Sequence, residues 1–328
     1  MNKKHIFFII VFLLLIAVPL VITDLYVIHI FIGTYISSIV AIGTGLLLYA
    51  MMISLGQAGI MAIGSYASTL LTMRCNLSFW LALPLSGIIS AVIGLIMGLP
   101  TFKLRGLYFF LITWAISEIV RLGIINAPSS LLGGHTGIPN VPLPDPIFIP
   151  GLGTIEFIGK TPFYYLIFSI LVLVSLVSYR LYVSHFGRVL YMISVSEDLA
   201  RSLGVNVGRY KASVWTIACF FAGIAGSLHA HYYQLAATQF FTFWHSIYFV
   251  MMPTIGGSTT ILGSITGAIF FTVIPEVFRQ IEIWKPVIFG AALILTVFLL
   301  PGGLETLPRV IGRIQAVKRI QKYVRRQG

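Results

Sequence analysis

Apolar residues follow one another in long continuous runs along the chain, and short polar or Gly- and Pro-containing stretches separate these runs. A helix needs about 20 such residues to cross the hydrocarbon core of a bilayer. The runs do not alternate between polar and apolar positions, which disfavours a transmembrane β-barrel. The pattern therefore predicts an all-α polytopic membrane protein with about ten transmembrane helices, with eight as the lower limit.

The predicted spans extend from the first residues to about position 300. They are 6–23, 27–50, 57–73, 79–99, 106–126, 163–183, 210–231, 243–257, 261–280 and 284–300. We interpret the first as an uncleaved span, because no A-x-A site typical of signal peptides follows it. The eighth is short, and the Gly- and Thr-rich stretch after it favours a broken or re-entrant helix. Residues 1–308 form one predicted transmembrane domain.

Composition supports the membrane assignment and limits the chemistry. Hydrophobic residues make up 58% of the chain and charged residues 9%, whereas soluble domains contain about 25% charged residues. The net charge of +12 fits the positive-inside rule without any nucleic acid. Cys75 and Cys219 lie far apart, and His229 and His231 face different ways on a helix. We therefore expect no metal and no cofactor.

The distribution of basic residues predicts the orientation. With the N-terminus in the cytoplasm, sixteen of the 21 Lys and Arg residues lie on the cytoplasmic side and five outside. This bias predicts an even number of spans with both termini in the cytoplasm. The loop 184–210 is then cytoplasmic and the loop 127–161 external. The basic tail 309–328 is predicted to be an amphipathic helix on the anionic cytoplasmic face.

The external loop is rich in Pro and Gly, which argues against a long helix. It caps a substrate entrance, docks an external partner, or simply connects two spans. Its segment GLGTIEFIGKT resembles a phosphate-binding loop, but Thr154 stands where the first glycine belongs. No other nucleotide-binding or hydrolase motif is present in the sequence, so an enzyme is not predicted.

The cytoplasmic loop contains the polar stretch SVSEDLARSLGVNVGRYK. Ser194 and Glu197 have the spacing of a capping box. Glu197 and Asp198 lie in the first turn, where the helix dipole favours negative charge. Gly204 suits the position just after a helix end. The stretch therefore predicts a short helix over Val195–Leu203.

Leu199 and Leu203 lie four residues apart on this predicted helix and form an apolar ridge. Such a ridge lies on the membrane or fills a groove in a soluble partner. The alternative is a solvated loop helix with no partner.

Two groups of polar residues inside spans are candidates for a translocation path or gate. Gln57 lies among small residues that allow close helix packing, and its amide either joins helices or faces a water-filled path. Glu118 and Arg121 share a helix face near the outer end of their span. They form a structural ion pair, a gate, or a contact to an external partner.

Several motifs, taken in order, resemble the permease subunits of branched-chain amino-acid ABC importers, of the LivM type. They are SLGQAGIMAIGSYAS, LRGLYFFLITWAISEIVRL, GGHTGIP, GRVLYMISVSEDLARSLGVNVGRYK and FFAGIAGSLHAHY, and they cover roughly residues 45–275. The resemblance implies a pore built with a second permease subunit, as a heterodimer, in the bacterial cytoplasmic (inner) membrane. It also implies two cytoplasmic ATPase subunits and an extracytoplasmic substrate-binding protein.

The same resemblance gives the polar stretch a role. Glu197, Ala200 and Gly204 resemble the E-A-A…G loop with which such permeases dock on their ATPases. The implied ATPase-coupling residues are Glu197, Asp198, Leu199, Ala200, Leu203 and Gly204. The stretch MISVSED carries less charge than the family pattern often has at this place, which leaves the substrate open.

Three other functions remain open at this stage. Related permeases carry urea, short amides or sugars. A stand-alone secondary transporter usually needs an intramembrane acid for ion coupling, and the spans offer few. A membrane scaffold without transport activity is the third alternative.

Overall fold

The computed structural model describes residues 24–277 except positions 105, 150–152 and 259, together with the isolated residues Pro19 and Gly290. Its helices are α2 (Leu25–Tyr49), α3 (Gln57–Met73), α4 (Phe79–Gly98), η1 (Leu99–Lys103), α5 (Leu107–Asn126), α6 (Ser129–Leu132), α7 (Lys160–Val183), α8 (His185–Val195), α9 (Glu197–Ser202), α10 (Val207–Tyr233), η2 (Thr238–Phe240), α11 (Phe243–Gly256) and α12 (Ile261–Val277). Its strands are β1 (Ile138–Pro139), β2 (Ile147–Ile149), β3 (Gly153–Ile155) and β4 (Leu235–Ala236). Apart from Pro19 and Gly290, the predicted spans 6–23 and 284–300 lie outside the described residues, as do positions 278–280 of the span 261–280 and the tail 309–328.

Within the described residues, five helices are long and apolar enough to cross a membrane: α2, α4 with η1, α5, α7 and α10. Helices α3 and α12 have 17 residues each, and α11 has 14. Fourteen residues extend about 21 Å, less than a hydrocarbon core of about 30 Å, as expected for the short eighth span. Seven predicted spans lie within residues 24–277 and coincide with helices, and the span 261–280 coincides with α12 as far as Val277. The all-α polytopic membrane fold is therefore confirmed.

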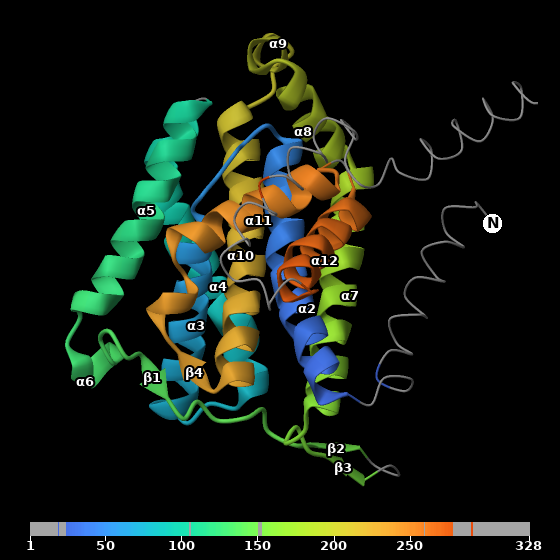
Figure 1. Cartoon of the computed structure of the whole chain (residues 1–328). Coiled ribbons are helices and arrows are strands. Elements are labelled where there is room, and N and C mark those ends of the chain that lie inside the picture. The colour runs from blue at the N-terminus through green and yellow to red at the C-terminus, as the bar shows by residue number, and fades with distance from the viewer. Residues whose placement is uncertain are drawn as a thin grey trace, which may run out of the picture.

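Helix α10 lies at the centre of the bundle and packs on α3, α4 and α2 (Figure 1). Glycines bring α3 and α10 into close contact, because a β-carbon at Gly64 would overlap the backbone of Gly223. A β-carbon at Gly226 would likewise overlap the carbonyl oxygen of Met61. The predicted packing through small residues is therefore confirmed. In the most apolar 18-residue window of α10, 67% of the residues are buried, whereas in that of the peripheral α5 only 28% are buried.

The two long loops lie at opposite ends of the bundle (Figure 1). One end carries α9, and the other carries β1, β2 and β3. Strand β1 pairs antiparallel with β4, which follows α10, so that Ile138 lies opposite Ala236. This pairing ties the loop 127–161 to the end of the central helix. The two loops were predicted on opposite sides of a membrane, and their positions in the fold agree with that arrangement.

Candidate functional site

Helix α9 begins later than the sequence suggested. Helix α8 continues to Val195, and Ser196 takes an extended conformation (φ −162°) that separates the two helices. The Ser196 hydroxyl accepts a hydrogen bond from the Leu199 N–H at 3.2 Å and caps α9. Ser194 instead donates to the Tyr191 carbonyl at 2.7 Å within α8. The predicted start at Val195 with Ser194 as its cap was wrong, because both serines have suitable spacing and only Ser196 leaves the helical backbone.

The end of α9 is the one that the sequence predicted. Gly204 has φ +83°, a left-handed conformation that glycine adopts without steric cost. Its N–H donates to the Arg201 carbonyl and the Val205 N–H donates to the Ala200 carbonyl, each at 3.0 Å. These two bonds form a Schellman motif, which closes the helix and turns the chain towards α10.

A small apolar cluster packs between α9 and its neighbours α8 and α10. Fully buried Ala200 packs there with Val189 and Ile193 of α8 and Val207 of α10. The cluster is separate from the main core of the bundle. Alanine at position 200 therefore holds α9 close to its two neighbouring helices.

An ion pair connects α9 to the central helix. The ammonium group of Lys211, in the second turn of α10, contacts the Glu197 carboxylate, and the Lys211 residue is only 4% exposed. Arg201 also lies near Glu197, at 3.4 Å, and near Asp198, at 3.1 Å. Both acidic residues of the predicted site are therefore engaged within the chain itself. The sequence analysis missed Lys211 as a partner, because fourteen residues separate it from Glu197.

The apolar ridge of Leu199 and Leu203 faces away from these contacts. Leu199 is 53% exposed and Leu203 is 64% exposed. Tyr191 and Val195 of α8 are also exposed. Since α9 stands at the extreme end of the bundle (Figure 1), the ridge projects beyond the packed helices. Large apolar side chains at such a place are available to pack on another surface.

Gln57 is the first residue of α3, and it is fully buried. Hydroxyl groups of α5 accept hydrogen bonds from nearby backbone amides, from Leu55 to Thr113 at 3.1 Å and from Gly59 to Ser117 at 2.9 Å. Neither polar atom of the Gln57 side chain has a hydrogen-bond partner among the described residues. Leaving such a group unsatisfied costs about 1–3 kcal/mol, and among the described residues the amide makes none of the interhelical hydrogen bonds that a packing role would use.

Glu118 and Arg121 form the ion pair that their spacing predicted. The Arg121 Nε donates to both carboxylate oxygens at 3.0 Å, and a terminal guanidinium nitrogen makes a further contact to one of them. Both side chains are partly exposed on α5. No hydrogen bond joins the pair to Gln57 among the described residues, so the candidate path residues do not form one hydrogen-bonded cluster.

The chain also matches a known family by sequence. Residues 26–297 match the family described as the permease component of the branched-chain amino acid transport system. The chain belongs to this family.

Individual relatives cover most of the chain. The high-affinity branched-chain amino acid transport permease LivM of Escherichia coli strain K12 is 30% identical over an alignment of 331 positions, which covers 94% of this chain and 76% of that protein. LivM of Salmonella typhimurium is 31% identical over 79% of this chain and 64% of its own length. The galactose/methyl galactoside import permease MglC of Escherichia coli is 27% identical over 64% of this chain and 63% of its length. No solved structure matches the chain significantly.

Proposed function

We propose that the chain is a transmembrane permease subunit of an ATP-driven importer of branched-chain, hydrophobic amino acids, and that α9 is its ATPase-coupling helix. The family and the similarity to LivM proteins support the transport role. The exposed ridge of Leu199 and Leu203, on a helix that is capped and held by an ion pair to α10, supports the coupling role. An apolar ridge on a short helix suits a groove in a soluble partner.

The proposed complex contains more than this chain. A second, different permease subunit completes the pore, and an extracytoplasmic binding protein delivers the substrate. Two cytoplasmic ATPases hydrolyse ATP, since the sequence of the permease carries no nucleotide-binding motif. The excess of Lys and Arg supports a cytoplasmic position for the α9 end in a bacterial inner membrane.

Gln57 is assigned to the translocation path in this proposal. A buried amide that has no hydrogen-bond partner among the described residues is suited to hydrogen-bonding a passing substrate or water. The Glu118–Arg121 pair is assigned to a gate on α5, because both side chains remain partly exposed and can exchange partners. Sugars are the second candidate substrate, which the similarity to a galactose permease favours.

Uptake measurements test the proposal. Cells that lack this chain should lose ATP-dependent uptake of labelled leucine, isoleucine or valine, and the wild-type chain should restore it. Leu199→Asp should restore less than about a tenth, because it places a charge in an apolar interface at a cost of several kcal/mol. Leu199→Met, which keeps the apolar surface, should restore nearly all uptake. Normal uptake by Leu199→Asp would return α9 to a solvated loop helix, and restored galactose uptake alone would favour the sugar alternative.

A further inference from the structure

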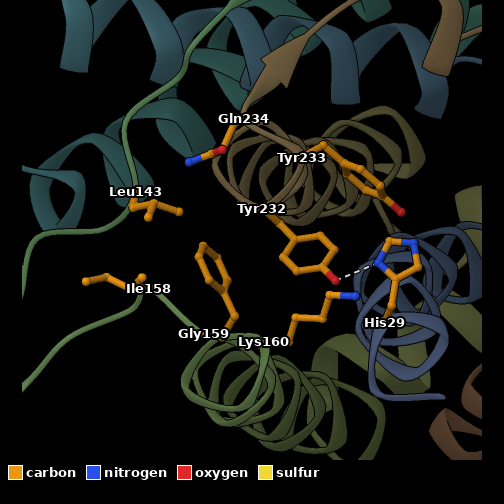
Figure 2. A pocket seen from close by; sticks show the side chains of 9 residues that line it. His29, Leu143, Ile158, Gly159, Lys160, Tyr232, Tyr233 and Gln234 are labelled. Atoms are coloured by element: carbon orange, nitrogen blue, oxygen red, sulfur yellow. Dashed lines mark hydrogen bonds between the residues drawn. The ribbon is translucent and has the colours of Figure 1, made fainter. Parts of the chain in front are cut away.

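A cavity of about 370 Å³ lies at the end of the bundle opposite α9, between the ends of α2, α7 and α10 and the loop 127–161. Figure 2 shows that its lining combines apolar and polar side chains, with the Gln234 amide close to Leu143. Leu143 and Ile158 lie on one side, and Lys160 and His29 lie on the other. None of these residues belongs to the candidate sites described above.

The polar side carries a cation that has no acidic partner among the described residues. The Lys160 ammonium donates to the Leu25 carbonyl oxygen at 3.3 Å, and no carboxylate among the described residues forms an ion pair with it. The adjacent His29 Nδ1 shares a hydrogen bond of 2.6 Å with the Tyr232 hydroxyl (Figure 2). Lys160 is also the first residue of α7, where the helix dipole disfavours a positive charge. Helix stability therefore does not explain a lysine at this position.

The apolar side is built largely by the loop. Leu143 precedes the hairpin of β2 and β3 and is half-buried. Ile158 follows the hairpin and is 76% exposed. The ring of Phe163 lies against that of Tyr232, with centroids 5.4 Å apart. A ligand in the cavity would cover this apolar wall while its anionic end met Lys160.

We infer that this cavity binds the transported hydrophobic amino acid, with the carboxylate on Lys160 and the branched side chain against Leu143, Ile158 and Phe163. The identity of the ligand rests on the proposed function. The lining suits an anionic group and an apolar group a few atoms apart, and a branched-chain amino acid combines both. A lipid offers the same chemistry, but Leu143 and Ile158 belong to the loop beyond the helix ends, so the ligand reaches the cavity from the aqueous side.

Binding to the full-length chain in nanodiscs of neutral phosphatidylcholine tests this inference. Labelled leucine should bind the wild type, and Lys160→Met should weaken binding about tenfold or more, since a charge-assisted hydrogen bond is lost. Arg74→Met is the matched control, because Arg74 also donates to loop carbonyls, those of Ser130 and Leu131, but lies outside this cavity. It should change leucine binding less than twofold. Leucinamide, which lacks the carboxylate, should bind the wild type about tenfold more weakly than leucine.

Three results would overturn the inference. Equal binding of leucine to the wild type and to Lys160→Met would remove the carboxylate contact. Displacement of leucine by added phosphatidylglycerol, in the wild type but not in Lys160→Met, would assign the cavity to a lipid headgroup. If the wild-type chain supports normal leucine uptake in cells but binds no leucine in nanodiscs, the cavity is not a leucine site, and the proposed function is unaffected. Loss of the transport role itself would appear separately, as failure of the wild-type chain to restore uptake.

Discussion

At one end of the bundle α9 projects as a short helix with two exposed leucines, whereas at the other end α2, α7, α10 and a loop enclose a cavity. The projecting surface is apolar, and internal ion pairs engage the charged side chains around it. The cavity combines an apolar wall with a lysine that has no acidic partner among the described residues. The difference fits the macromolecular partner that we propose for the α9 end and the small ligand that we propose for the opposite end. This comparison is tested by substitutions that weaken the attachment of α9 and by a substitution of Gln57 on the proposed translocation path.

The largest effect is expected from loosening α9. Lys211→Met should reduce ATP-driven uptake about tenfold, because it leaves Glu197 with a weaker partner and detaches α9 from α10. Breaking a fully buried pair costs about 3–5 kcal/mol, and the remaining Arg201 contact lowers this cost to about 1–3 kcal/mol. Uptake and thermal unfolding of the purified variant measure the two consequences.

Arg209→Met is the matched control for this variant, because Arg209 is an exposed cation two residues earlier on the same helix. Its uptake should remain near that of the wild type. The exchange Glu197→Lys with Lys211→Glu should recover part of the uptake by restoring opposite charges. Equal losses of uptake in Lys211→Met and Arg209→Met would show that uptake depends on the total basic charge at this end and not on the Lys211–Glu197 ion pair.

An intermediate effect is expected between the two ends, at Gln57. Gln57→Leu should leave the unfolding temperature unchanged or raise it, since two unsatisfied buried polar atoms disappear. Uptake should nevertheless fall several-fold if the amide contacts the passing substrate. Ser65→Ala is the control, because the Ser65 hydroxyl is also buried on α3 without a partner. Normal uptake by a stable Gln57→Leu protein would make Gln57 a packing residue.

The smallest effect is expected at the end of α9. Gly204→Val should lower uptake by a few-fold, because a β-branched residue at φ +83° adds about 1–3 kcal/mol of strain. No atom lies within 4 Å of the added β-carbon, so the cost arises from the backbone alone. Gly208→Val adds the same side chain in the first turn of α10, where φ is not positive, and uptake should be unchanged. Similar losses in both variants would contradict the role of the α9 turn.

The sequence predicted the spans well because burial in a bilayer depends on local hydrophobic length. The predicted span 57–73 has the bounds of α3. The start of α9 was misplaced because Ser194 and Ser196 both suit a cap, and local spacing does not distinguish them. The Lys211–Glu197 pair and the cavity escaped prediction for another reason. Each joins residues distant in sequence, and only the packing of α10 against its neighbours brings them together.

Photocrosslinking from the ridge tests the central claim most directly. A benzoylphenylalanine in place of Leu199, activated in cells that contain the complete transporter, should form a covalent product with the ATPase subunit. The same group in place of Ile158, which is exposed at the opposite end, should form none. Products with the ATPase from position 158, or none from position 199 in cells that still take up leucine, would contradict the assignment of α9 as the coupling helix.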